Sequence, residues 1–207
     1  MNLLIFGATG RVGGRLAALA LRDGHRVFAL VRSPDKLGAP REGLTAIPGD
    51  ALREADIACA MDVRPDAVVS ALGTDGATTL SSAMPLLTAA MEKAGVGRLV
   101  TIGTAGILQS RAEPELLRYQ SGESRRKLTR AAEEHRRVYE FLRESALNWT
   151  IVCPTYLPDG EATGVYRVER DLLPVGGSEI SVGDTAAFAY RQLTDDTYGR
   201  ARVGIAY

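Results

Sequence analysis

A glycine-rich segment near the amino end of the sequence has the composition of a phosphate-binding loop. In GATGRVGG, residues 7–14, the glycines Gly7, Gly10 and Gly13 follow a short apolar run and open a stretch of helical periodicity. Gly7 permits a tight turn, Gly10 lets backbone N–H groups approach a pyrophosphate, and Gly13 allows a helix to pack closely on a strand. A helix N-terminus also attracts negative charge. We therefore expect a bound dinucleotide phosphate here, in preference to a tight turn without a ligand.

The residues after the second apolar run indicate which dinucleotide binds. NAD-selective proteins place Asp or Glu at the end of that strand, where the carboxylate accepts a hydrogen bond from the ribose 2′-OH. This sequence has Arg32 and Ser33 there, and its first carboxylate comes later, at Asp35. A guanidinium binds a 2′-phosphate through charge-assisted hydrogen bonds of about 1.5–3 kcal/mol each. Arg11, inside the glycine loop, could flank the same phosphate or stack on adenine. The predicted cofactor is NADP(H).

Strand and helix patterns alternate along most of the chain. Short apolar runs predict buried strands at Asn2–Phe6, Arg26–Val31, Thr45–Ile47, Ala67–Ser70, Arg98–Ile102 and Trp149–Cys153. Helical periodicity predicts helices at Val12–Arg22, Leu52–Met61, Ser81–Lys93 and Arg126–Ser145. The apolar side chains expected on the buried face of the last helix are Leu128, Ala131, Ala132, Val138, Phe141 and Leu142. This alternation predicts an α/β protein with a Rossmann-like, doubly wound parallel sheet and helices on both faces.

The pattern changes after Pro154. The chain becomes rich in Pro and Gly, and we expect a small hairpin near Val165–Ser181, a helix at Asp184–Leu193 and a last strand at Arg202–Ile205. Residues 1–207 should form a single NAD(P)-binding domain. Because ligands of open α/β sheets bind at the carboxyl ends of the strands, we expect residues 154–207 to contribute a small C-terminal lobe on the substrate side.

Composition argues against several other classes of protein. The 25 Lys and Arg residues balance the 25 Asp and Glu residues, so no nucleic acid or anionic membrane is expected as a partner. No apolar stretch has the length of a membrane span or of a signal-peptide core. Cys59 and Cys153 are isolated, lack metal-ligand spacing, and are interpreted as core residues. We expect a cytoplasmic protein that binds no metal.

Other polar residues invite a catalytic interpretation that their sequence context does not favour. His25 lies in a helix-to-strand turn, where a surface or capping role is expected. His135 lies in EEHRR and is interpreted as part of a solvated ion-pair surface on the long helix. The arginines at Arg125, Arg126 and Arg130 are interpreted as an exposed helix start and not as a nucleic-acid site.

Several motifs together carry a resemblance to a known group of proteins. GATGRVGG with VRSP, GDAL (49–52), SALGT (70–74) and TIGTAG (101–106) resembles the atypical short-chain dehydrogenase/reductase families that have an NAD(P)-binding domain. Residues 135–166 are similar to the matching stretch of the biliverdin-IXβ reductase and flavin reductase family. That likeness continues through ISVGDTAAFAYRQLTDDTYG to the last residue, so it covers essentially the whole chain.

The resemblance implies a cofactor-binding role for a set of residues along the carboxyl edge. The residues implied to hold the pyrophosphate are Gly7, Thr9, Gly10, Arg11 and Val12, and Gly13 belongs to the same cofactor-binding loop. Arg32 and Ser33 are implied to bind the 2′-phosphate. The residues implied to lie beside adenine and along the ribose are Asp50, Ala51, Ala71, Leu72 and Gly73.

By the same resemblance, Thr104 stands where the family has a Ser or Thr beside the nicotinamide, and Pro154, Thr155 and Tyr156 form the adjoining turn. Thr104 and Tyr156 are the candidate catalytic residues. The family's flavin reductases carry a His at the place of Tyr156. Two interpretations therefore stay open for each residue: Thr104 orients the nicotinamide or simply ends a strand, and Tyr156 is a wall of the acceptor site with a possible proton-donating hydroxyl or a packing aromatic.

The residue pair that reduces carbonyl groups in typical short-chain dehydrogenases is absent. Those enzymes use Tyr-x-x-x-Lys, in which the lysine helps the tyrosine to pass a proton. The lysines of this sequence, Lys36, Lys93 and Lys127, do not follow a tyrosine at that spacing. What remains is hydride transfer to an acceptor that needs little help from a protein acid, such as a flavin, a conjugated tetrapyrrole or a quinone.

The sequence thus predicts an NADPH-dependent reductase with a conjugated, flavin-like small-molecule acceptor, acting as a monomer or weak homodimer. The alternative is a redox sensor or scaffold protein that binds NADP(H) without turnover, since loss of Tyr-x-x-x-Lys fits both. Residues 108–124 are long, polar and contain Gly and Pro, and they follow the expected nicotinamide strand. We expect this segment to be a mobile lid over the acceptor.

Overall fold

A single sheet forms the centre of the molecule. The structure is a computed structural model that describes residues 1–74, 76–124 and 128–207. The strands are β1 (Asn2–Phe6), β2 (Arg26–Val31), β3 (Leu44–Pro48), β4 (Ala67–Ser70), β5 (Arg98–Ile102), β6 (Asn148–Pro154), β7 (Arg167–Arg170) and β8 (Ala201–Ala206). Their order across the sheet is β3-β2-β1-β4-β5-β6-β8-β7, and the pairs are parallel except β7 with β8.

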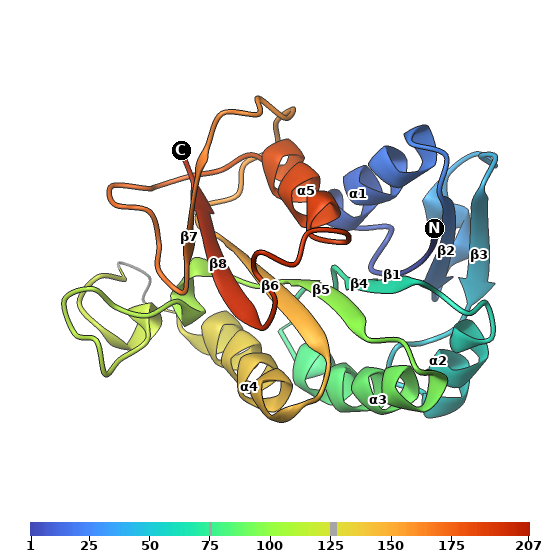
Figure 1. Ribbon diagram of the computed structural model, residues 1–207, viewed down its shortest axis with the longest axis horizontal. Helices are drawn as coiled ribbons and strands as arrows, with labels where there is room; N and C mark the ends of the chain where they lie inside the picture. The colour runs from blue at the N-terminus through green and yellow to red at the C-terminus, as the bar shows by residue number, and fades with distance from the viewer. Residues whose placement is uncertain (75, 125–127) are drawn as a thin grey trace.

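Helices cover both faces of this sheet (Figure 1). The helices α1 (Arg11–Arg22) and α5 (Val182–Arg191) pack on one face, and α2 (Glu54–Met61), α3 (Thr79–Ala94) and α4 (Arg130–Glu144) pack on the other. β1 shows why both faces are needed: Leu3 and Ile5 join the core beneath α1 and α5, whereas Leu4 and Phe6 join the opposite core. The predicted doubly wound, Rossmann-like fold is confirmed.

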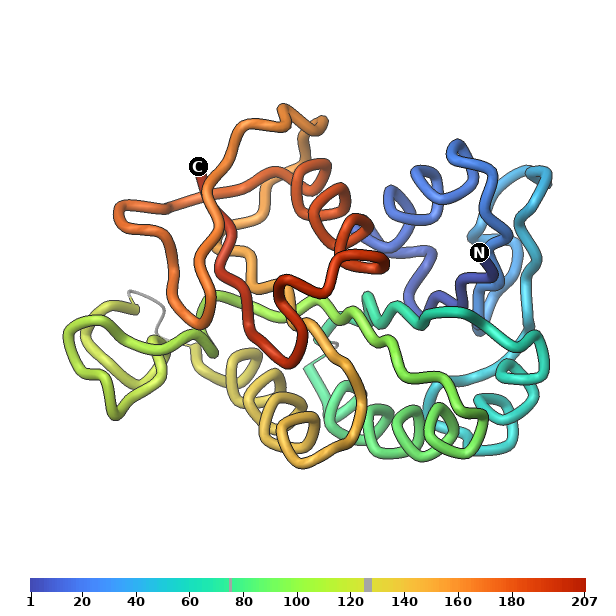
Figure 2. Tube along the Cα trace, in the orientation of Figure 1, coloured from blue at the N-terminus to red at the C-terminus, as the bar shows by residue number. Residues whose placement is uncertain are grey.

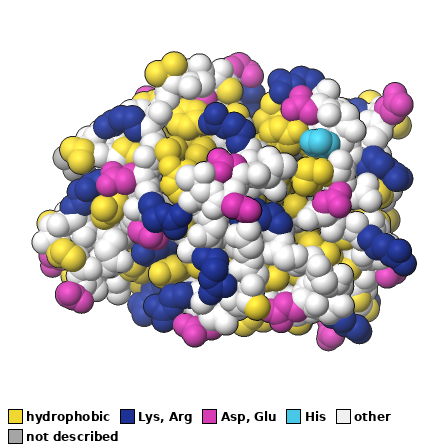
Figure 3. Space-filling model, viewed as in Figure 1, with side chains coloured by type: hydrophobic (Ala, Val, Ile, Leu, Met, Phe, Trp, Pro, Cys, Tyr) yellow, Lys and Arg dark blue, Asp and Glu magenta, His cyan; other side chains and the backbone are white. Residues whose placement is uncertain are grey.

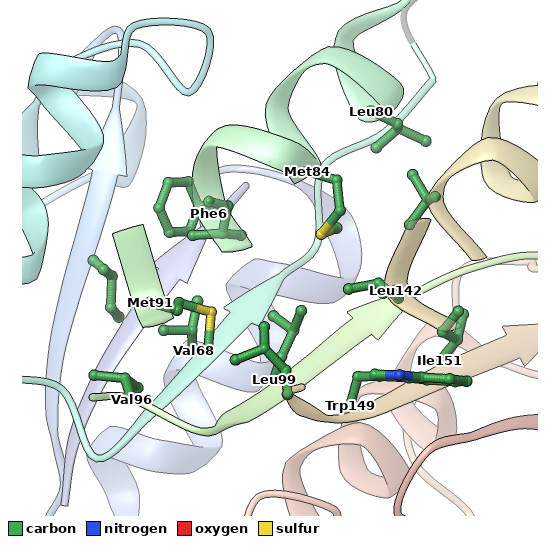
Figure 4. Close-up of a cluster of buried hydrophobic side chains, with 14 of the residues drawn as sticks. Phe6, Val68, Leu80, Met84, Met91, Val96, Leu99, Leu142, Trp149 and Ile151 are labelled. Carbon is green, nitrogen blue, oxygen red and sulfur yellow. The ribbon is translucent and has the colours of Figure 1, made fainter. Parts of the chain in front are cut away.

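The larger core lies between the sheet and α2, α3 and α4. Figure 4 shows Phe6, Val68 and Leu99 from the strands in one cluster with Met84 and Met91 of α3. On the outside, basic and acidic side chains are interspersed over the face shown in Figure 3. None of the helices formed by the described residues combines the length and the apolarity needed to cross a lipid bilayer.

Two helices begin later than their sequence patterns indicate. The predicted helix from Leu52 starts at Glu54 because the preceding residues form a turn, in which the Asp50 carboxylate accepts a hydrogen bond of 2.9 Å from the Leu52 N–H. In the predicted helix from Arg126, residues 128 and 129 are not helical and α4 begins at Arg130; residues 125–127, including Arg125 and Arg126, lie outside the described residues. Arg130 itself is an exposed helix start, as expected.

The buried face predicted for α4 is too wide. Val138 and Leu142 are buried, but Leu128 precedes the helix and is 88% exposed, and Phe141 is 39% exposed. Ala131 is exposed as well. The pattern over-counted because apolar residues next to the helix start can also line a cavity, which is where Leu128 lies.

The predicted hairpin within Val165–Ser181 is wrong. Its first half does form a strand, β7, but this strand pairs antiparallel with the last strand, β8, so that Val168 lies opposite Ile205. This pairing covers the free edge of β8. The following helix begins earlier than predicted, at Val182, because the Ser181 hydroxyl accepts a hydrogen bond of 3.0 Å from the Asp184 N–H and caps it.

Three further expectations can be compared with the structure. Cys153 is fully buried, as expected, and burial raises the pKa of its thiol to about 12. Cys59 is exposed on α2, so the expectation of a core role is wrong. His135 is half-buried among the ion pairs Arg136–Glu140 and Arg137–Glu134, and burial lowers its pKa to about 4, although Glu134 opposes this, so the imidazole itself is neutral near pH 7. His25 lies at the amino end of β2, away from the carboxyl edge, as expected.

A buried carboxylate ties the C-terminal segment together. Asp184, fully buried at the start of α5, accepts hydrogen bonds from the N–H groups of Thr163 and Gly164 at 3.0 and 2.8 Å and from the Tyr207 hydroxyl at 2.7 Å. Burial alone raises the pKa of this carboxyl, but the hydrogen bonds outweigh burial and the net pKa is lowered. The charged form therefore holds residues 163–164 and the chain end on the sheet.

We expect Asp184→Asn to lower the free energy of unfolding at pH 7 by about 1.5–3 kcal/mol, the worth of one charge-assisted hydrogen bond. Because the folded-state pKa of Asp184 is lowered, its contribution is complete above the unfolded-state pKa and is lost as pH falls through the folded-state value. Urea unfolding should therefore show a difference between wild type and variant that shrinks as the pH is lowered. Asp62→Asn, at an exposed aspartate, is the control; a pH-independent difference would contradict this role of Asp184.

Candidate functional site

The carboxyl ends of five neighbouring strands form one continuous edge. After β2, β1, β4, β5 and β6 the chain turns away at residues 32, 7, 71, 103 and 155. Backbone bonds keep the turns in register: Ala71 N–H donates to Phe6 C=O at 2.9 Å, and Gly103 N–H donates to Val152 C=O at 2.7 Å. Four steps between strands of about 4.8 Å give roughly 19 Å from the end of β2 to the end of β6. An extended, two-ended ligand fits such an edge.

The glycine loop has a shape that side chains would destroy. Gly7 has a φ of +81°, and a Cβ there would lie 2.4 Å from the Ala71 carbonyl oxygen. A Cβ on Gly13 would lie 2.2 Å from the Gly7 carbonyl oxygen. Gly10 precedes α1 and supplies no side-chain cap, so the first N–H groups of the helix, at Arg11 and Val12, face outward without a capping partner. This is an anion cradle, and a pyrophosphate fits it.

The structure places Arg32 and Ser33 where the sequence analysis expects them. Arg32 is the first residue after β2 and is exposed. Its guanidinium has no hydrogen-bond or ion-pair partner among the residues that the structure describes, whereas Arg11 and Arg15 of α1 are both paired with carboxylates. Ser33 begins the short 3-10 helix Pro34–Leu37. A free cation is thus available at one end of the edge.

Arg11 has a different partner from the one expected. Its guanidinium donates to the Leu157 carbonyl oxygen at 2.9 Å and pairs with Asp159 at 3.1 Å. One turn later, Arg15 pairs with Glu161 at 2.7 Å. All four charged side chains are at least partly exposed, so the pairs contribute little to stability. They nonetheless join the glycine-loop helix to residues 157–161, and Arg11 does not reach toward Arg32 in this state.

The middle of the edge contributes mainly backbone. Asp50 and Ala51 are half-buried in the turn after β3, where the Asp50 carboxylate is already engaged by its own turn. Ala71 and Leu72 leave β4 directly beside Gly7. Gly73 is exposed, and the space around its Cα is open. These positions fit the planar and sugar parts of a dinucleotide because no large side chain fills the edge.

The other end of the edge carries hydroxyl groups. Thr104 follows β5 and its hydroxyl accepts a long hydrogen bond of 3.5 Å from the Gly106 N–H. Pro154 ends β6 and is buried. The next residue, Thr155, has a buried hydroxyl with no hydrogen-bond partner among the described residues. A buried polar atom of this kind commonly pairs with a ligand or water, so the Thr155 hydroxyl fits the carboxamide of a nicotinamide.

Tyr156 lies at the mouth of this region. Its side chain is 60% exposed, and its carbonyl oxygen accepts a hydrogen bond of 3.0 Å from the Ile180 N–H. The backbone is therefore fixed while the ring remains free to contact a ligand. Between Thr104, Thr155 and Tyr156 the surface is hollowed into a cavity of about 240 Å³.

The sequence analysis missed several residues of this cavity. Besides the threonines and Tyr156, its walls include Arg118, Tyr119, Glu123, Leu128, Ala132 and Leu173. The first three belong to the segment 108–124, which projects from one end of the molecule (Figure 2). Loop residues have no periodicity that would mark them, and an aromatic residue in a polar loop was the one signal that could have singled out Tyr119.

The projecting segment is held by its own hydrogen bonds. Gln109 donates from its side chain to the Leu116 carbonyl oxygen at 3.0 Å, and Arg118 N–H donates to the Leu108 carbonyl oxygen at 2.8 Å. Arg118 also pairs with Glu123 at 2.8 Å, and both of these side chains are only 19% exposed. The segment therefore forms a defined wall of the cavity.

Comparison with known proteins supports the cofactor assignment. Residues 7–196 match the model of a family described as NAD(P)H-binding. The uncharacterized protein YwnB of Bacillus subtilis (strain 168) is 28% identical over 202 residues, which cover 93% of this chain and 92% of YwnB.

Two crystal structures are also similar over the whole chain. One, from Burkholderia pseudomallei and described provisionally as an exported protein, has 31% identity, a TM-score of 0.87 and full coverage of both chains. The other, from Streptococcus pneumoniae TIGR4 and described provisionally as an NADH-flavin reductase, has 25% identity, a TM-score of 0.82 and 99% coverage of that chain. The family resemblance seen in the sequence is confirmed.

The glycine loop gives a prediction that separates binding from folding. Gly10→Ala should weaken NADPH binding with little loss of stability, because its Cβ would lie 3.2 Å from the Gly7 carbonyl oxygen and 3.9 Å from the Ala71 carbonyl oxygen and would otherwise occupy the cradle. Gly13→Ala should lower both the affinity for NADPH and the free energy of unfolding, because its Cβ would collide with the Gly7 carbonyl oxygen. Overpacking of this kind costs about 1–3 kcal/mol. Calorimetric titration and thermal unfolding measure the two effects. Gly97→Ala, where a Cβ has open space, is the matched control; wild-type NADPH affinity in Gly10→Ala would contradict the cradle.

Proposed function

The chain belongs to the NAD(P)H-binding family, and from that premise we propose that it is an NADPH-dependent reductase that transfers hydride to a conjugated acceptor such as a flavin. The coarser class, an NAD(P)H-dependent oxidoreductase, follows from the family and from the similarity to the streptococcal protein. The choice of NADPH and the class of acceptor are our proposals. The observation that carries them is the hydroxyl-lined cavity at one end of the cofactor edge, opposite the free Arg32 at the other end.

Successive positions along the carboxyl edge would bind successive parts of the cofactor, from the 2′-phosphate at one end to the nicotinamide at the other. Arg32 and Ser33 would hold the 2′-phosphate, and the N–H groups at the start of α1 would hold the pyrophosphate. Thr104 and Thr155 would orient the nicotinamide through their hydroxyl groups. When bound, the reduced nicotinamide supplies a hydride; the chain's part is to hold the ring against the cavity and to fix its carboxamide.

The acceptor would lie in the cavity, against Tyr156. Its half-exposed ring offers a flat apolar wall, and the backbone beneath it is anchored through Ile180. Segment 108–124 closes the opposite side, and we propose that it acts as a lid whose movement admits the acceptor. Residues 154–207 contribute the substrate side of the site through Thr155, Tyr156 and Leu173, while β8 and α5 of the same stretch belong to the sheet and its cover.

The function is tested by following NADPH oxidation with FMN, FAD, riboflavin, biliverdin and quinones in turn. We expect turnover with at least one of these acceptors. The alternative, a non-catalytic sensor or scaffold, predicts instead that NADPH binds in a calorimetric titration but is oxidised with none of them.

The free guanidinium after β2 predicts cofactor preference. NADPH should bind more tightly than NADH, and Arg32→Ala should weaken NADPH binding by about ten- to a hundredfold, which corresponds to one lost contact of about 1.5–3 kcal/mol. NADH affinity should be unchanged. Arg41→Ala is the control because Arg41 is also exposed but precedes β3, and so lies toward the amino ends of the parallel strands. Equal affinities of the wild type for the two cofactors would end this assignment.

The cavity walls predict how turnover depends on shape. Tyr156→Phe should retain most of the kcat with FMN because the wall remains, whereas Tyr156→Ala should lose more through a looser acceptor pose. Thr104→Val should have an intermediate effect through the lost hydroxyl contact. Steady-state kinetics and thermal unfolding of the three variants are the measurements. If Tyr156→Phe is as damaged as Tyr156→Ala, the hydroxyl acts as a proton donor and the wall interpretation is wrong.

A further inference from the structure

Tyr119 lies beside the candidate nicotinamide residue, although the two are far apart in sequence. Its Cβ atom lies 3.4 Å from the position that a Gly106 Cβ would take, and Thr104 Cγ2 lies 3.6 Å from that same position. Both residues line the one cavity, together with Thr155 and Tyr156. The same Gly106 Cβ position lies 3.1 Å from Ala132 Cβ, so Tyr119, Thr104 and the start of α4 all meet around Gly106.

The hydroxyl of Tyr119 has a cationic neighbour. Arg136 of α4 donates from Nη1 to this hydroxyl at 3.2 Å, and from Nε to the Glu140 carboxylate at 2.6 Å. The hydrogen bond to Tyr119 is the largest of the effects that raise the pKa of Arg136, followed by the bond to Glu140. A guanidinium has only donors, so the tyrosine oxygen is the acceptor in this bond. The phenolic proton itself therefore stays available for another acceptor.

This arrangement has the chemistry of the missing Tyr-x-x-x-Lys pair. In that pair a cation beside a tyrosine hydroxyl stabilises the phenolate that forms when the tyrosine gives up its proton. Here the tyrosine comes from a loop and the cation from a helix, 17 residues apart. Among the described residues, the other charged groups of the cavity wall, Arg118 and Glu123, are paired with each other, and Arg136 is the cation that contacts the Tyr119 hydroxyl.

We propose that Tyr119 donates a proton to the acceptor during reduction, with Arg136 as the positioning residue. A quinone, which the sequence analysis grouped with acceptors that need little help from a protein acid, would then be reduced with the help of one. The proposal rests on the proposed function. A hydride from the reduced cofactor bonds to a carbon of the conjugated system, and the electron pair of the broken double bond moves to the carbonyl oxygen. That oxygen takes the Tyr119 proton. The phenolate, stabilised by Arg136, regains a proton from water through the partly exposed side of the pair.

A flavin makes a smaller demand on this proton, because hydride addition to its ring nitrogen gives an anion that is stable near neutral pH. Comparing a quinone with a flavin therefore tests whether Tyr119 donates a proton. With NADPH and 1,4-naphthoquinone, Tyr119→Phe should lower kcat by roughly a hundredfold or more, as expected for loss of a general acid. With FMN the same variant should keep most of its kcat. The solvent deuterium isotope effect on quinone reduction should also vanish in Tyr119→Phe.

The positive charge of Arg136 is tested by removing it and by replacing it with that of a lysine. Arg136→Gln should lower kcat for the quinone while the KM for the quinone stays close to that of the wild type, and Arg136→Lys should restore much of the loss. Tyr198→Phe is the matched control, since Tyr198 packs on Phe188 away from the cavity. Equal losses with quinone and FMN in Tyr119→Phe, or no loss with either, would overturn the role of Tyr119. A wild type that binds NADPH but oxidises it with neither acceptor would instead refute the proposed function.

Discussion

The constraint on which the rest of the structure depends is a contact between backbones at the carboxyl end of β1. The carbonyl oxygens of Gly7 and Ala71 occupy the places where Cβ atoms of Gly13 and Gly7 would stand, at 2.2 and 2.4 Å. This contact brings α1 against β1 and keeps the turn after β4 beside the loop. The sheet order also reverses here, with β2 on one side of β1 and β4 on the other, and an open α/β sheet binds its ligand at such a crevice. A phosphate can reach the N–H groups of α1 because the packing leaves no room for side chains.

The acceptor end depends on a different kind of interaction, a buried charge. Arg202 of β8 is only 4% exposed; its guanidinium donates to the Ile107 carbonyl oxygen and to Asp171 at 3.1 Å, and it lies 4.2 Å from the centre of the Tyr139 ring. Burying a charge is costly unless hydrogen bonds and a counter-charge compensate, and here they do. The Arg202 side chain thus connects residues 104–109, at one wall of the cavity, to Asp171, which lies two residues before Leu173 in another wall. The cavity is thus set by β8, a strand that contributes no residue to its lining.

The sequence alone predicted the elements with a periodic apolar pattern and the glycine loop, whose backbone leaves no room for side chains. Apolar runs located the strands because parallel strands are buried on both faces, and the glycines of the loop located the cradle because only they fit its backbone. It was insufficient where a partner comes from far along the chain. β7 pairs with the distant β8 and not within the hairpin expected at 165–181. Arg11 forms an ion pair with Asp159, and Tyr119 contacts Arg136 through tertiary packing alone. Residue spacing along a helix or strand is visible in a sequence, whereas a loop docked on a helix has no period to read.

The two ends of the site consequently differ in how they can change. The cofactor end is built from backbone groups on β1, β4 and α1, where a Cβ on Gly7 or on Gly13 would collide with a main-chain carbonyl oxygen. The acceptor end is built from side chains on segment 108–124, on the turn after β6 and on the start of α4, and these contact one another through side-chain surfaces. A substitution at the second end can alter the shape or the proton-donating groups of the cavity without disturbing the cradle. On the proposed function, cofactor binding and acceptor choice are therefore separable, and the loop tyrosine proposed as the proton donor lies at the end that can change.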